Sequence, residues 1–116
     1  MLRKDVFQSC LVLYPEIVWN ERLDLLKSQL RPWKQAHQQI FRQFVSEAEI
    51  VSLDGNGRFL IPKRLIKLAE IEQDIQFIGM DNTIEIWSPE KLKQTLKSEE
   101  EFGREFESIM NISDNL

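Results

Sequence analysis

The feature that most constrains this fold is the run Asp-Gly-Asn-Gly at positions 54–57, which stands between two apolar stretches. Asp54 can bond the backbone two residues further on, and glycine accepts positive φ. Such a run predicts a hairpin turn formed by Gly55, Asn56 and Gly57. We therefore expect "EIVSLD" to be a strand leading into the turn and "RFLIP" to be the returning strand, which Pro62 ends.

Two helices are expected before the turn. Apolar residues recur every three or four positions from Glu16 onward, and Pro32 interrupts the pattern before it resumes. The first stripe consists of Trp19, Leu23, Leu26 and Leu30, and the second of Trp33, Ala36, Ile40, Phe41 and Phe44. The short break predicts an antiparallel helical hairpin across 16–45 that buries two tryptophans and two phenylalanines.

After the turn the sequence predicts a short helix at 63–69 and two further strands, "IQFIGM" and "TIEIWS". Ser88 as N-cap and Pro89 as the first helical residue then open a C-terminal helix. The chain is thus predicted to be α+β, with four short strands between 50 and 88. We expect the final residues to be poorly ordered.

The stretch "CLVLYPEIVWNERL" near the start has the same plan as "TIEIWSPEKLKQTL" near the end. Each has an alternating strand, an aromatic residue where the strand ends, and a helix opened by proline and glutamate. This fixed order predicts two copies of one unit. Only the second copy has the Asp-Gly-Asn-Gly turn upstream, so the first copy lacks its front. Arg3 and Lys4 do not replace that part, because no turn precedes them.

The net charge of −4 is unevenly distributed along the chain. Residues 99–116 form an acidic tail with six acids and one base, a net charge of −5. Residues 54–67 carry one acid against Arg58, Lys63, Arg64 and Lys67, a net charge of +3. A basic patch beside an acidic tail is compatible with phosphate binding, although many solvated helix faces look the same.

Little in the sequence favours catalysis or metal binding. The single histidine, His37, lies on a predicted helix without a partner for base catalysis, and the single cysteine, Cys10, is expected to be a small buried residue. Gly55 and Gly57 precede a strand rather than a helix, which argues against a phosphate-binding loop. We therefore predict no enzyme, no metal site and no cofactor. Apolar runs are too short to cross a bilayer, so we expect a cytoplasmic protein without a membrane partner.

Two interpretations of Arg58 remain open. A rigid turn can present an arginine to a phosphate or a guanine edge with little loss of side-chain entropy, as in strand-based readers of DNA. Alternatively, Arg58 and Asp54 form a surface ion pair that serves only the turn.

The sequences "LDGNGRFLIPKRL" and "IQFIGMDNTIEIWSPEKL" resemble the second half of the MraZ family of bacterial transcriptional regulators. The shared pattern is Asp54, three residues, Arg58, an apolar pair and Pro62, followed by the "IEIW" strand. Upstream, "CLVLYPEIVW" and "QQIFRQFVSEAEIVSLD" resemble the end of the family's first repeat and its linker.

The resemblance implies a swapped-hairpin β-barrel unit of the AbrB type, with a helical hairpin before it and a C-terminal helix. The implied parts are a remnant of the first AbrB-like half-repeat (1–31), a linker helix (32–48), a second AbrB-like repeat (49–98) and the acidic tail (99–116). The front that the first copy lacks would leave open strand edges, which favour pairing with another chain.

The resemblance further implies a nucleoid-associated homo-oligomer, ring-like in the family, that binds double-stranded DNA at promoter direct repeats of the division and cell-wall gene cluster. The implied DNA contact is Arg58 of the Asp54–Arg58 motif. We accordingly expect the DNA-binding residues to be Asp54, Arg58, Lys63 and Arg64, with Lys63 and Arg64 contributing mainly through charge. The alternative is an oligomeric protein-interaction module, or an antitoxin-like partner binder, that does not bind DNA.

Overall fold

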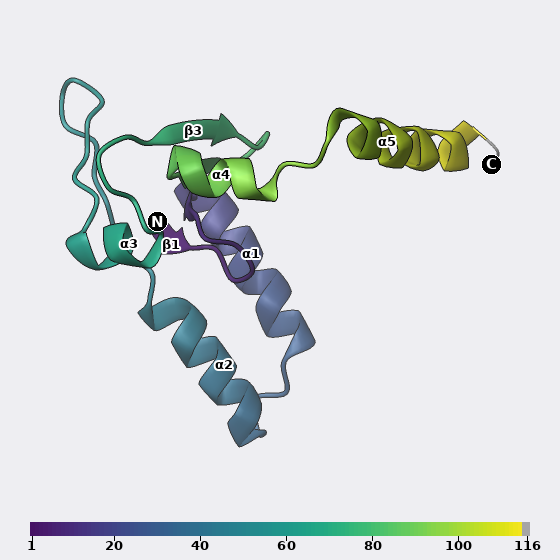
Figure 1. Cartoon of the computed structure of the whole chain (residues 1–116). Helices are drawn as coiled ribbons and strands as arrows, with labels where there is room; N and C mark the ends of the chain where they lie inside the picture. The colour runs from purple at the N-terminus through teal and green to yellow at the C-terminus, as the bar shows by residue number, and fades with distance from the viewer. Residues whose placement is uncertain (115–116) are drawn as a thin grey trace.

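In the computed structural model, which describes residues 1–114, five helices accompany a four-stranded sheet (Figure 1). In chain order the elements are β1 (Leu2–Lys4), β2 (Leu11–Leu13), α1 (Glu16–Gln29), α2 (Gln35–Ser46), α3 (Lys63–Leu68), β3 (Gln76–Gly79), β4 (Ile84–Trp87), α4 (Pro89–Thr95) and α5 (Glu99–Asp114). The predicted α+β class is confirmed. The last residues, which we expect to be poorly ordered, lie outside the described part of the chain.

The sheet is built from two hairpins that meet at its centre. The strand order is β1-β2-β4-β3, and every neighbouring pair is antiparallel. Between the hairpins, Leu11 faces Ile86 and Leu13 faces Ile84. This register is symmetric about the central pair, so a local twofold axis relates the two hairpins. Each hairpin is followed by a helix, α1 or α4, and the two similar sequence stretches therefore occupy equivalent places.

Apolar side chains are buried on both faces of the sheet. The buried residues on one face are Leu2, Leu11, Leu65, Ala69 and Ile86. Those on the other face are Cys10, Val12, Trp87 and Leu92. Helix α3 contributes Leu65 to the first cluster, and α4 contributes Leu92 to the second. The sheet thus fixes α3, and with it the chain that leads from the Asp54 turn.

The two helices predicted across 16–45 are confirmed, but the prediction of how they bury their aromatic residues is wrong. Trp19 is buried and stacks on Phe44, with ring centroids 5.3 Å apart. Trp33, in contrast, is 78% exposed. It lies in the connection between α1 and α2, so it does not continue the apolar stripe of α2.

The strands predicted on either side of the turn are also wrong. Of the four strands expected between 50 and 88, the structure forms β3 and β4, while residues 50–62 are irregular. Val51, Phe59 and Ile61 pack their side chains against the Leu65 cluster. Their apolar pattern therefore reflects burial on the sheet face and not pairing within the sheet.

A strand that the sequence did not predict, β1, forms the outer edge instead. It extends by one bridge, in which Leu2 and Glu49 exchange two backbone hydrogen bonds of 2.8 Å. Because residues 50–62 do not join the sheet, the four-stranded sheet formed within residues 1–114 is not closed into a barrel.

The C-terminal helix starts as predicted and then divides. Ser88 and Pro89 open α4, which ends at Thr95. Helix α5 follows after three residues and contains most of the predicted acidic tail. Figure 1 shows α5 standing clear of the rest of the molecule.

Candidate nucleic-acid interface

The turn predicted from Asp-Gly-Asn-Gly is present and is organised by Asp54. The Oδ1 atom of Asp54 accepts hydrogen bonds from the backbone N–H groups of Asn56 (2.8 Å) and Arg58 (2.9 Å). The Asp54 N–H donates to the Arg58 carbonyl at 2.7 Å, and the Gly57 N–H donates to the Asp54 carbonyl at 3.0 Å. Gly57 has φ +77°, which glycine adopts without strain. A single carboxylate therefore closes the loop without flanking strands.

The same carboxylate orients the arginine. Arg58 Nε donates to Asp54 Oδ2 at 3.2 Å, and the arginine side chain is 75% exposed. Within residues 1–114 neither Nη atom of Arg58 makes a hydrogen bond, so both remain available to a ligand. The hydrogen bonds from the Arg58 and Asn56 backbone, followed by the Arg58 side chain, lower the pKa of Asp54 below its ordinary value of 3.8. Asp54 therefore stays charged at neutral pH.

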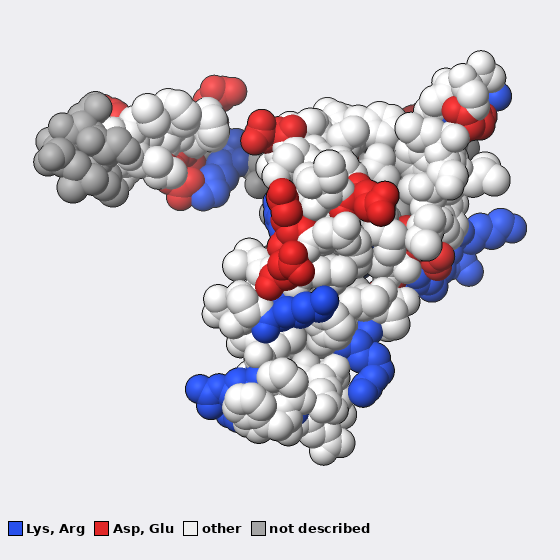
Figure 2. All heavy atoms as spheres, turned by 180° about the vertical axis from the view of Figure 1, so that it is seen from behind, with Lys and Arg blue, Asp and Glu red and all other residues white. Residues whose placement is uncertain are grey.

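Helix α3 adds further cations at the same edge of the molecule. Figure 1 shows the loop protruding at the edge where α3 lies, and Figure 2 shows acidic and basic side chains together on that loop. Lys63 and Lys67 are exposed, and neither forms an ion pair or side-chain hydrogen bond with the described residues. Arg64 is also exposed but is held by other groups of the protein.

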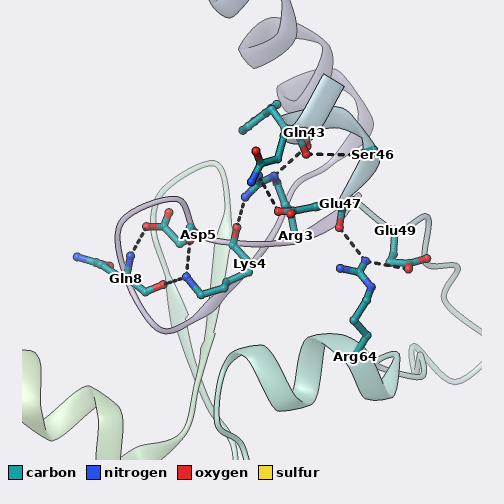
Figure 3. Close-up of polar contacts among 10 residues, drawn as sticks. Arg3, Lys4, Asp5, Gln8, Gln43, Ser46, Glu47, Glu49 and Arg64 are labelled. Atoms are coloured by element: carbon teal, nitrogen blue, oxygen red, sulfur yellow. Dashed lines mark hydrogen bonds and ion pairs between the residues drawn. The ribbon is translucent and has the colours of Figure 1, made fainter. Parts of the chain in front are cut away.

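Arg64 joins α3 to the end of α2 (Figure 3). One of its Nη atoms donates to the Glu47 carbonyl at 2.9 Å and to Glu49 Oε1 at 3.0 Å. The Arg64 side chain remains 44% exposed, so it can contact a ligand from this fixed position. Glu49 is also the residue that bridges to Leu2, and the arginine is thereby tied to the edge of the sheet.

A buried arginine, Arg3, lies behind this connection and anchors α2 to β1. It is 7% exposed and lies 4.6 Å above the Phe44 ring. Its Nε donates to the Phe44 carbonyl at 2.9 Å, one Nη donates to the Lys4 carbonyl at 2.5 Å, and the other donates to Glu47 Oε2 at 3.3 Å (Figure 3). These contacts make Arg3 a structural residue, although it is charged.

The structure brings some predicted site residues together and separates others. Asp54, Gly55, Asn56, Gly57 and Arg58 form one loop, as predicted from their order. Lys63 and Arg64 lie on α3, and no hydrogen bond or ion pair joins them to Arg58 in the described part of the chain.

Sequence reasoning did not find Arg3, Glu47 and Glu49 as the supports of this region. The β1–β2 connection carried a usable signal, since Asp5 Oδ2 accepts the N–H groups of Phe7 and Gln8 in a side-chain turn. A hairpin at that point would have placed Arg3 in a strand. The partners of Arg3 on α2, however, follow only from tertiary packing.

Other potential sites lack the required groups. Among the residues described, no three His, Cys, Asp or Glu side chains are grouped so that they could hold a metal ion. No helix formed by residues 1–114 has the length and apolar character needed to span a membrane. His37 Nδ1 accepts the Arg31 N–H at 2.9 Å and so supports the α1–α2 connection. Cys10 is fully buried, as predicted.

Comparison with known proteins places the chain in a family. The family described as "MraZ protein, putative antitoxin-like" matches residues 44–110, which include the Asp54 turn, α3, β3 and β4. This match extends over more than half of the chain and includes most of α5.

Several relatives match nearly the whole chain, and the three described next each bear the name transcriptional regulator MraZ. The protein from Phocaeicola vulgatus is 57% identical over 116 residues, which are 100% of this chain and 75% of the relative. That from Bacteroides thetaiotaomicron is 58% identical over 96% of this chain and 71% of its own length. That from Flavobacterium psychrophilum is 31% identical over 99% of this chain and 74% of its own length. The chain therefore belongs to the MraZ family.

Proposed function

We propose that this protein is a sequence-specific DNA-binding transcriptional regulator whose Arg58 contacts DNA from the Asp54 turn. The observation that carries the proposal is the orientation of the guanidinium. Asp54 occupies its Nε atom, while the two Nη atoms remain available on an exposed loop. A paired set of N–H donors matches the O6 and N7 acceptors of guanine and the oxygens of a phosphate.

The neighbouring cations are suited to contacts with the DNA backbone, which are less sequence-specific than the proposed base contact of Arg58. Lys63 and Lys67 are exposed and unpaired in the described chain, which suits phosphate contacts. Arg64 is held by Glu47 and Glu49, so its remaining donors would approach DNA from one fixed direction. We therefore assign base recognition to Arg58, orientation of Arg58 to Asp54, and backbone contacts to Lys63, Arg64 and Lys67.

The proposal includes an oligomer of AbrB-type units. Residues 1–31 and 49–98 would be related repeats, 32–48 the linker and 99–116 the acidic tail. The outer edge of β3 has no strand neighbour within residues 1–114, and a second chain could pair with it. Several copies in a ring would present several Arg58 side chains to short direct repeats in promoter DNA. The expected target is the division and cell-wall gene cluster, and the expected location is the cytoplasm, on the nucleoid.

A gel-shift titration with Arg58→Ala tests the proposal. DNA from upstream of the division and cell-wall cluster serves as probe, and shuffled DNA of equal length serves as competitor. One bidentate base contact contributes about 1–3 kcal/mol, so we expect a loss of specific affinity of about 5- to 150-fold, and more where several copies bind together. The matched control is Arg22→Ala, which removes an exposed arginine from α1.

The outcomes separate DNA binding from the alternative of a protein-interaction module. Lys63→Ala should weaken specific and shuffled DNA alike and reduce the salt dependence, because it removes a phosphate contact. Equal losses for Arg58→Ala and Arg22→Ala would contradict base recognition by Arg58. The absence of any salt-sensitive DNA binding by the parent would favour the interaction module.

A further inference from the structure

Helix α5 has an apolar face that the other described residues leave largely exposed. Phe102 and Phe106 are 59% and 56% exposed, and their ring centroids lie 5.9 Å apart on successive turns. Glu99 and Glu105 fall on either side of this pair around the helix. The helix as a whole carries six acids and one base. An exposed aromatic stripe with acidic flanks is typical of a helix that docks into a groove.

A groove of matching character lies between α1 and α2. It encloses about 680 Å³ and is lined by Lys27, Leu30, Arg31, Pro32, His37, Gln38, Phe41, Arg42, Val45 and Ser46. Leu30, Phe41 and Val45 supply apolar surface. The lining, all of it in the described chain, holds three cations and no carboxylate. Figure 2 shows basic side chains gathered around this end of the molecule.

The two surfaces complement each other in apolar character and in charge. An aromatic stripe can fill the apolar centre of the groove, and the flanking Glu99 can meet a cation along its rim. The Lys27 ammonium already lies 5.8 Å above the Phe41 ring, so an aromatic surface and a cation coincide within the groove. Burial of two phenylalanines would remove a large exposed apolar area from water.

We propose that α5 of one copy docks into the α1–α2 groove of a second copy. Only three residues separate α4 from α5, and α5 points away from the α1–α2 pair of its own chain (Figure 1). Lys97 pairs with Glu105, and Ser98 Oγ accepts the Glu101 N–H, so the start of α5 is held in this direction. The inference deepens the oligomer in the proposed function and rests on it, because it requires copies that meet.

Cysteine cross-linking between two differently tagged chains tests this contact. Both chains carry Cys10→Ser, one also carries Phe106→Cys on α5, and the other carries Val45→Cys in the groove. Each chain then has one thiol, so every cross-link joins two molecules. We expect a prominent hetero-tagged product after mild oxidation of the mixture. Ile17→Cys, at an apolar position 73% exposed and outside the groove, is the matched control and should give several-fold less product.

A second groove variant, a chain with both substitutions and a light-scattering measurement complete the experiment. Leu30→Cys supplies a second groove position if Val45→Cys fails to fold, as judged by circular dichroism. Product equal to that of the Ile17→Cys control, or product only between two Phe106→Cys chains, would overturn the inference. The inference would also be overturned if a single chain that carries both Phe106→Cys and Val45→Cys formed only intramolecular cross-links on dilution. Light scattering separates the two proposals: oligomers without the hetero-tagged product overturn only the α5 contact, whereas monomers alone overturn the proposed oligomer as well.

Discussion

Replacement of Arg3 by methionine should destabilise the fold more than the loss of its ion pair alone would explain. Arg3 is 7% exposed and donates to two carbonyls, those of Phe44 and Lys4, as well as to the Glu47 carboxylate. Methionine retains much of the packing volume but provides no donor. The Phe44 and Lys4 carbonyls would therefore lose their partner inside the protein.

The magnitude follows from these three contacts. A hydrogen bond from a charged donor contributes about 1.5–3 kcal/mol, but the freed carbonyls are partly buried and can recover some of this from water. The Glu47 side chain is 42% exposed, so its ion pair contributes only about 0–1 kcal/mol. We expect Arg3→Met to lower the free energy of unfolding by about 2–4 kcal/mol. That corresponds to a fall in Tm of roughly 8–16 °C.

Urea unfolding followed by circular dichroism measures this change. Glu47→Gln should cost less than about 1 kcal/mol, since it removes only the ion pair. Arg22→Met, at an exposed position of α1, should be nearly neutral and controls for loss of charge. An Arg3→Met protein that unfolds within about 0.5 kcal/mol of the parent would show that solvent replaces the carbonyl contacts completely.

Three other predictions follow from named contacts. Leu65→Ala should cost about 2–5 kcal/mol in urea unfolding because Leu65 is fully buried, whereas Leu60→Ala, at 91% exposure, should stay within about 0.5 kcal/mol of the parent. Burial, followed by Glu85, raises the pKa of Cys10 to about 12, so a thiol reagent at pH 8 should modify it only after unfolding, and rapid labelling of the native protein would contradict this. The hydrogen bonds to Asp54 lower its pKa, so the carboxylate stabilises the turn fully above pH 3.8, and this stabilisation is lost as the pH falls through the folded-state pKa. The amide NMR shifts of Asn56 and Arg58 should therefore stay constant from pH 7 to about 4 and change only below about pH 4.

The helices and the turn could be predicted because their determinants are local. The 3.6-residue period of 16–45 and the Pro89 start of α4 depend on neighbours in sequence. The same is true of the Asp54 side-chain bonds that close the turn. The apolar pattern did not specify which part of the protein each apolar segment packs against. Phe59 is apolar because it packs on the sheet face, and a strand would have shown a similar pattern.

The candidate site likewise has features that the local sequence predicts and features that depend on tertiary packing. The exposure of Arg58 and its bond to Asp54 follow from the order of residues in the loop. The attachment of Arg64 to Glu47 and Glu49 depends on where α2 ends relative to α3, which no short sequence pattern records. Strand β1 is three residues long, too short for a period of two to be recognised.

The central pairing of β2 with β4 has a consequence for synthesis of the protein on the ribosome. The two strands come from opposite parts of the sequence, so the sheet cannot assemble until β4 has left the exit tunnel. At about 5–20 residues per second, the first hairpin is exposed for on the order of several seconds before its partner exists. During that interval Leu2 and Leu11, which are fully buried in the final fold, meet solvent. During synthesis, the hairpin of β1 and β2 is therefore the part of the sheet most open to chaperones and to neighbouring nascent copies on the same messenger RNA.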